Sequence, residues 1–235
     1  MKLKLYFLFL LYILFSSSCG IFLYKSPTAK VNLFEKRNDF NAQLNMGGAG
    51  TELYAAYSPV DYIGFSAGIA GYKRDEDSNS SLHVIPRSFR DFEISVIPYF
   101  PYQQFRFEML IGIGFTKYSF PGNPDYSPYT RTFFQPTIGF HSEYFEPAFF
   151  IRCSSIDYFE PRWGKDTRYE PGMMFRGGSK NFKAMLQFRL DSGTNYSQTA
   201  AANLPIEQRL LYLSFHVSLG ITISLNFGND NETVK

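Results

Sequence analysis

The stretch that decides the fold is residues 211–227, LYLSFHVSLGITISLNF. Every second residue in it is apolar, and the residues between are mostly small or polar. A period of two is typical of a β-strand with one apolar and one polar face. Such a long alternation, ending on an aromatic residue, favours a strand that faces lipid on one side and a barrel interior on the other. On this interpretation Ile221 faces lipid and Ser218 faces the interior.

The chain begins with the features of a secretory signal peptide. Residues 1–18 have a basic start, an apolar run over residues 5–15 and three serines directly before Cys19. This composition predicts an exported protein. The apolar run is too short to span a bilayer as a helix, although a retained signal anchor is the alternative.

The junction Ser-Ser-Cys-Gly at residues 17–20 resembles a bacterial lipoprotein signal. The resemblance implies that Cys19 is acylated and becomes the first residue of the mature chain. Ser16 stands where such signals usually carry Leu, so an ordinary signal-peptidase cut nearby is the alternative. Gly20, where Asp favours retention in the inner membrane, permits export to the outer one.

Composition excludes several other classes. The mature chain has one further cysteine, Cys153, so neither a disulfide framework nor a Cys/His metal spacing is available, and we expect no metal or cofactor. Without Lys2 and Lys4, the 21 remaining basic residues equal the 21 acidic ones, which argues against nucleic acid as a partner. The 26 Phe and 17 Tyr suit the interfacial girdles of a membrane barrel.

Alternating segments recur along the rest of the chain and predict ten strands. They are residues 40–46, 53–57, 63–69, 91–96, 105–115, 134–140, 149–152, 169–175, 182–190 and 211–227. If the two weakest are misassigned, the count is eight. The fold class is therefore all-β, a transmembrane antiparallel up-and-down β-barrel.

The connections between these segments alternate between short and long. Four are short turns, and four are long, polar and rich in Asn, Ser, Asp, Gly and Pro: residues 73–88, 119–131, 157–168 and 191–208. Short periplasmic turns and long outer loops are typical of outer-membrane barrels. Only the first connection, around residues 47–50, is short where a long one is expected.

We divide the chain into a signal peptide (1–18), a lipid-anchored tether (19–37), the barrel (38–228) and a short polar tail (229–235). An even number of strands places both termini on the periplasmic side. The predicted location is the outer membrane of a Gram-negative bacterium, with outer-membrane lipid as the surroundings.

Residues 32–68, with the motifs LFEK at 33–36 and AAYSP at 55–59, resemble the start of small lipid-anchored barrel proteins of Bacteroidota. The resemblance implies a lipid anchor and an outer-membrane barrel. It brings no catalytic residues to carry over.

The interior face of the predicted barrel carries charges of both signs. They are Asp91, Glu93, Arg106, Glu108, Arg152, Glu170, Lys183 and Arg189. Unpaired charges in a narrow lumen are costly, so we expect them to pair in a salt-bridged plug; a polar conduit is the alternative. Inward glycines at 64, 68, 112, 114, 139 and 220 make room for long side chains or relieve curvature.

Catalytic signals are weak. His83 follows the acidic residues 75–77, and a carboxylate–histidine pair at the outer rim is what omptin-type barrel proteases use to activate water. His141 falls near the periplasmic end of its strand, and His216 points into the lumen. A solvated loop histidine is the ordinary interpretation, and we predict no catalytic residues.

The leading functional hypothesis is a non-enzymatic barrel with a structural or interaction role through its long outer loops. Aromatic residues in those loops, such as Trp163 and Phe159, suit contact with an envelope glycan or another envelope protein, or an interfacial girdle. A small-solute transport barrel is the second hypothesis. An outer-membrane enzyme acting at the outer rim is the third.

Overall fold

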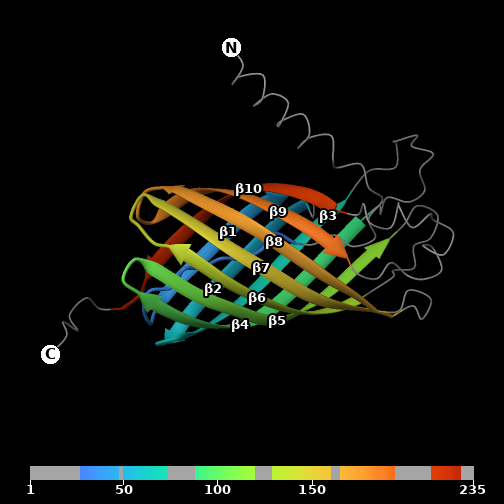
Figure 1. Ribbon diagram of the computed structural model, residues 1–235, viewed down its shortest axis with the longest axis horizontal. Coiled ribbons are helices and arrows are strands. Elements are labelled where there is room, and N and C mark those ends of the chain that lie inside the picture. The colour runs from blue at the N-terminus through green and yellow to red at the C-terminus, as the bar shows by residue number, and fades with distance from the viewer. Residues whose placement is uncertain are drawn as a thin grey trace, which may run out of the picture.

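The computed structural model describes residues 27–47, 50–73, 88–119, 129–159, 165–193 and 213–228. Ten antiparallel strands form one closed barrel, confirming the fold class and the higher strand count (Figure 1). The strands are β1 (Asp39–Gly47), β2 (Gly50–Val60), β3 (Ile63–Lys73), β4 (Ser88–Tyr102), β5 (Phe105–Ser119), β6 (Tyr129–Phe140), β7 (Phe145–Tyr158), β8 (Lys165–Gly178), β9 (Phe182–Gly193) and β10 (Leu213–Asn226).

Each strand pairs with its neighbours in sequence, and β1 closes the barrel against β10. The closing register pairs Asp39 with Asn226 and Leu44 with Ile221. Closure of the ring leaves no sheet edge unpaired. A strand in lipid requires this, because no water is present there to form hydrogen bonds with its backbone N–H and C=O groups.

The two ends of the barrel differ in their connections. At one end, the short-turn end, strands are joined by residues 61–62, 103–104, 141–144 and 179–181. The opposite end, the long-loop end, carries the connections 74–87, 120–128, 159–164 and 194–212. The β1–β2 connection also lies there but has only residues 48 and 49, with Gly47 paired to Gly50.

The outer wall is apolar and exposed, whereas the inner wall is polar and buried. Ile221 is 36% exposed and Leu219 60%, while Ser218, directly before Leu219, is only 8% exposed. The same alternation runs through β4 and β6. Exposed apolar side chains all around a closed barrel identify the lipid-facing surface of a membrane-spanning structure. None of the described segments forms a helix long and apolar enough to cross a membrane.

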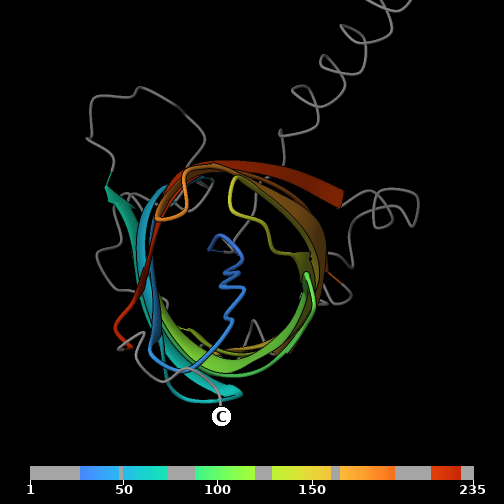
Figure 2. The same cartoon turned by 90° about the vertical axis from the view of Figure 1, so that its left-hand side faces the viewer.

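Residues 27–34 lie inside the barrel and are buried, whereas the sequence predicted a tether over 19–37 (Figure 2). Figure 2 views the barrel along its axis and shows this blue segment within the ring of strands. We call residues 27–36 the lumen segment. Its lack of alternation has a physical reason: it is not a strand of the sheet, and inward side chains of the wall satisfy its backbone.

Candidate functional site

The filled lumen is the candidate functional site, and the lumen segment crosses it from the long-loop end. Glu52, near the start of β2, accepts hydrogen bonds from the backbone N–H of Thr28 at 2.7 and 2.9 Å. The same carboxylate binds the Thr28 hydroxyl at 2.7 Å and forms an ion pair with Lys30. Glu52 and Lys30 are 1% and 2% exposed, so the pair lies out of water.

Farther along, Glu108 near the start of β5 holds two successive N–H groups of the lumen segment. Its Oε1 accepts from Asn32 at 2.6 Å and its Oε2 from Leu33 at 3.0 Å. Leu33 has φ of +56°, a left-handed conformation that costs a non-glycine residue about 1–2 kcal/mol. Successive N–H groups in such a turn make a concavity for an anion, and the Glu108 carboxylate occupies it.

Amide side chains from three strands complete the hold on the lumen segment. Gln187 accepts from the Ala29 N–H at 3.1 Å and donates to its carbonyl at 2.8 Å. Gln135 donates to the Lys30 carbonyl at 2.6 Å, and Gln43 donates to the Val31 carbonyl at 2.7 Å. The wall thus supplies the hydrogen bonds that a paired strand would otherwise supply.

The lumen segment leaves the barrel at the short-turn end through a cluster centred on Glu146. Its carboxylate lies 2.6 Å from His141 Nδ1, 2.9 Å from Lys183 Nζ and 3.0 Å from Arg176 Nε. Arg176 also donates to the carbonyls of Val31 and Asn32 at 3.4 and 3.3 Å. This cluster connects three strands of the wall, β7, β8 and β9, to the carbonyls of the segment.

Toward the long-loop end, the charges of the wall pair with one another. Arg131 Nη2 lies 3.1 Å from Asp91 and 2.9 Å from Glu93. Arg152 Nη2 lies 3.5 Å from Glu93, and its guanidinium stacks 4.3 Å from the centroid of the Phe133 ring. We call Asp91, Glu93, Arg131 and Arg152 the upper charge cluster; all are at most 4% exposed.

A second group of charges lies on β8 and β9 near the same end. Arg168 binds Asp166 at 2.6 Å and lies 3.6 Å from Asp191. Arg189 Nε lies 3.9 Å from Glu170, and Arg189 also donates to the Pro27 carbonyl. Arg189 therefore joins the charges of the wall to the first described residue of the lumen segment.

Two inward glycines make room for the lumen segment. A Cβ on Gly64 would lie 2.5 Å from Cε2 of Phe34, and a Cβ on Gly139 would collide with Leu33. A Cβ on Gly114 would lie 2.7 Å from Arg131 Nη2, which matches the expectation that glycines make room for long side chains.

The structure buries all eight charged residues that the sequence assigned to the lumen. Their partners are Arg131 for Asp91 and Glu93, Glu35 for Arg106, backbone N–H groups for Glu108, Glu93 for Arg152, Arg189 for Glu170, and Glu146 for Lys183. Two of these pairs, Arg152–Glu93 and Arg189–Glu170, fall within the predicted set. The other contacts use residues outside it.

Sequence reasoning missed several inward charges. They are Lys30, Glu52, Arg131, Glu146, Asp166, Arg168, Arg176 and Asp191, together with the exposed Glu35 that binds Arg106 at the short-turn end. The alternation of the strands predicts those that lie on strands. Arg131 has the same parity along β6 as the inward Gln135, and Glu146 has the same parity along β7 as the inward Arg152, so both should point inward. Lys30 and Glu35 carried no such signal, because their segment has no period.

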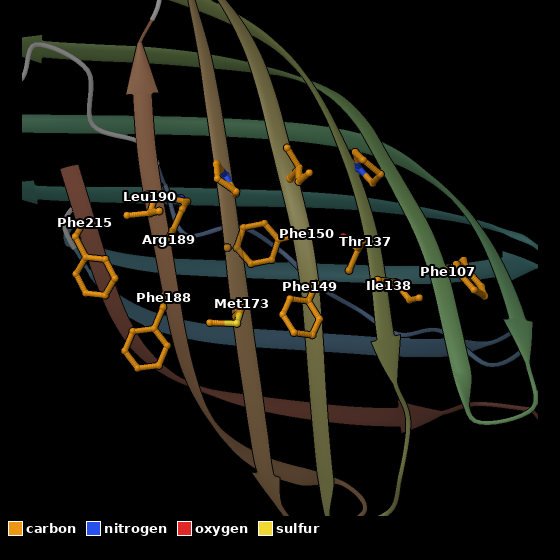
Figure 3. Close-up of a pocket in the computed structure, with 14 residues that line it drawn as sticks. Phe107, Thr137, Ile138, Phe149, Phe150, Met173, Phe188, Arg189, Leu190 and Phe215 are labelled. Atoms are coloured by element: carbon orange, nitrogen blue, oxygen red, sulfur yellow. The ribbon is translucent and has the colours of Figure 1, made fainter. Parts of the chain in front are cut away.

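A hollow of about 730 Å³ lies on the outer wall across β5 to β10 (Figure 3). Phe107, Phe149, Met173, Phe188 and Phe215 line it, with Pro136 and Pro171 beside them. This is the lipid-facing surface, and its apolar side chains suit acyl chains rather than a polar substrate. A second hollow of about 360 Å³, at the short-turn end, includes His141, Glu146 and Lys183.

The structure describes only some of the histidines, the predicted anchor and the loop residues that the sequence analysis considered. Cys19, His83, the acidic residues 75–77 and Trp163 lie outside the described residues. His141 lies in the turn after β6, and His216 on β10 is opposite Arg189. Within the described ranges, no group of three or more His, Cys, Asp or Glu side chains converges to hold a metal ion. Phe159 follows β7 and is 64% exposed.

An apolar lipid-facing wall around a polar, filled lumen defines a membrane-spanning β-barrel of the outer-membrane type. A scan against protein-family models finds no match. A search of curated proteins likewise finds no matching sequence.

Several solved structures have a similar barrel. The outer membrane protease OmpT from Escherichia coli is 10% identical, with 80% of this chain and 97% of that chain covered and a TM-score of 0.47. The N-terminal β-barrel domain of Pseudomonas aeruginosa OprF is 11% identical, covering 81% and 100%, with a TM-score of 0.32. The loop-deleted OmpT of Vibrio cholerae is 8% identical, covering 82% and 61%, with a TM-score of 0.37. At these identities and scores, no activity passes from those proteins to this chain.

Proposed function

We propose that this protein is a lipid-anchored, non-enzymatic barrel of a Gram-negative outer membrane, with a closed lumen and a structural or interaction role at its long-loop end. The observation that carries the proposal is the lumen segment. Its backbone is bonded from Thr28 to Leu33 by side chains of β1, β2, β5, β6, β8 and β9. A solute path would have to displace these contacts.

Conductance in planar bilayers tests the closed lumen. Purified protein, shown to be folded by heat-modifiability on a gel, is expected to give no steady current. A closed barrel places its buried charges against partners, whereas a conduit keeps its charges hydrated. Stable single-channel steps from the folded protein would overturn the proposal in favour of small-solute transport.

Cross-linking in cells tests the interaction role. A photoreactive amino acid at Phe159, exposed beside the loop after β7, is expected to give an adduct with an envelope glycan or envelope protein. The matched control is Tyr62, which is 57% exposed but lies in the short turn between β2 and β3. The same adducts at both positions would contradict a role specific to the long-loop end.

Attachment of lipid at Cys19 follows from the Ser-Ser-Cys-Gly junction and is tested separately. Radiolabelled palmitate is expected to enter the wild type and not Cys19→Ala. The barrel of that variant should still insert, because its lipid-facing strands supply the main burial and each acyl methylene adds only about 0.8 kcal/mol. A wild type that takes up no palmitate would contradict the anchor.

A further inference from the structure

The direction of the lumen segment determines on which side of the membrane the residues before it must lie. Thr28 is bound by Glu52, the third residue of β2, at the long-loop end. Glu35 binds Arg106, the second residue of β5, at the short-turn end. The chain therefore passes through the lumen from the long-loop end to the short-turn end, turns, and begins β1.

An even number of strands does place the start of β1 and the end of β10 at the same end, with Asp39 paired to Asn226. From this parity alone, the sequence predicts both termini on the periplasmic side. Passage through the lumen reverses the side for Pro27, which lies with Arg189 toward the long-loop end.

The unusually short β1–β2 connection lies where the lumen segment enters. A Cβ on Gly47 would lie 3.5 Å from the Thr28 hydroxyl, so the segment passes directly beside the last residue of β1. The other four connections at this end span 6 to 19 residues, whereas this one has two. A connection of two residues is too short to fold over the point where the segment enters the barrel.

Chain length then limits where Cys19 can lie. Eight residue steps separate it from Pro27, a reach of at most about 26–29 Å. That is close to the roughly 25 Å apolar band of an outer-membrane barrel, so a return to the periplasmic side would need a nearly straight path. The lumen is already filled, and a path through lipid would leave backbone groups without hydrogen bonds.

We propose that Cys19 lies on the outer side of the membrane and that its acyl chains enter the outer leaflet beside the β1–β2 hairpin. The side of the membrane on which Cys19 lies does not depend on its acylation. The insertion of acyl chains into the outer leaflet rests on the lipid attachment proposed above. The barrel then displays its own N-terminal end at the cell surface, and the lumen segment fixes that end in place.

Labelling of intact cells with a membrane-impermeant maleimide tests the placement, in a Cys153→Ser background. Ser26→Cys, next to the first described residue, is expected to react to the same extent before and after the outer membrane is permeabilised. Phe159→Cys is the control for the outer side. Lys180→Cys, exposed in the turn between β8 and β9, is the control for the periplasmic side and should react only after permeabilisation.

The outcomes separate the two proposals. If Ser26→Cys behaves like Lys180→Cys, the outer placement is wrong whatever the state of Cys19. The Cys153→Ser parent carries Cys19 alone, which is blocked when acylated. If this parent reacts on intact cells, the placement is correct and the lipid anchor is wrong. If it is silent and takes up palmitate, the lipid anchor is supported, and the reaction of Ser26→Cys on intact cells then decides the placement.

Discussion

Toward the long-loop end, Arg131 bridges Asp91 and Glu93, whereas toward the short-turn end Glu108 binds the backbone N–H groups of Asn32 and Leu33. In the first region the wall carries both signs of charge and neutralises itself. In the second, Glu108 and the amide side chains of Gln43 and Gln135 have the backbone of the lumen segment as their partner. The same inward alternation thus serves a self-contained ion-pair cluster and a binding groove for the lumen segment.

Breaking the upper charge cluster should lower the free energy of unfolding more than breaking the contacts of Glu108. Arg131→Leu leaves Asp91 and Glu93 in the upper charge cluster with only part of their compensation, and we expect a loss of about 3–5 kcal/mol in the free energy of unfolding. Urea unfolding followed by gel mobility measures it. Adding Asp91→Asn should restore part of the loss, because Glu93 and Arg152 then remain as one balanced pair. If Asp91→Asn lowers stability further, the arginine acts by packing and not by charge.

Both regions lie inside the same lipid-facing wall. The second prediction tests that wall by placing an arginine at two depths along β10. Ile221→Arg, within β10, is expected to cost about 2–4 kcal/mol because the guanidinium must enter the apolar band. Phe227→Arg is the control. It lies on the same face just beyond the end of β10 and is 63% exposed, so the cost there should be at most about 1 kcal/mol. Equal tolerance of the two changes would contradict the placement of β10 across the membrane.

The sequence predicted the wall well because a period of two is a local property. Strand number, the two faces and the unequal ends all followed from alternation and connection length, and Ile221 and Ser218 face as expected. The partners inside the lumen did not follow. Asn32 and Glu108 are 76 residues apart, and alternation gives the direction of a side chain but not what lies opposite it.

The lumen segment was the largest difference from the sequence-based expectation. It has no period, because its hydrogen-bonding partners are single side chains on six strands and not one neighbouring strand. An aperiodic stretch before a barrel therefore predicts a tether as readily as an occupant of the lumen. Two features of the sequence are explained by the segment: Gly64, which leaves room for Phe34, and the short connection at 47–50, beside which the segment enters. Neither feature predicts an occupant of the lumen by itself.

The third prediction sharpens the contrast by changing charge alone at the groove. Glu108→Gln keeps the shape of the side chain but replaces one acceptor oxygen with an N–H₂ group, which then faces a backbone N–H of Asn32 or Leu33. We expect a loss of about 1–3 kcal/mol, the cost of one unsatisfied buried donor. Amide hydrogen exchange at both residues should also become faster.

Glu143→Gln is the matched control for that change, since Glu143 is exposed in the turn between β6 and β7. It should leave both the free energy of unfolding and the exchange rates as in the wild type. Unchanged exchange at Asn32 and Leu33 in Glu108→Gln would show that the carboxylate does not hold the segment.

The smallest expected effect concerns packing of the lumen segment against the wall. Phe34 lies over Gly64 and contacts Tyr99, with ring centroids 5.4 Å apart, in a buried apolar cluster near the short-turn end. Gly64→Ala places a methyl group 2.5 Å from the Phe34 ring, and the ring must shift. Overpacking of this kind typically costs about 1–3 kcal/mol, and we expect the lower part of that range because Phe34 is at the end of the segment.

Gly177→Ala is the control for this change, because a Cβ there meets nothing closer than the Tyr144 carbonyl oxygen at 3.8 Å. Its free energy of unfolding should match the wild type within error. The contrast between the two alanines isolates contact with the lumen segment from the general effect of removing a glycine from a strand. If both variants unfold alike, Phe34 is not packed on the wall, and the segment is held by its hydrogen bonds alone.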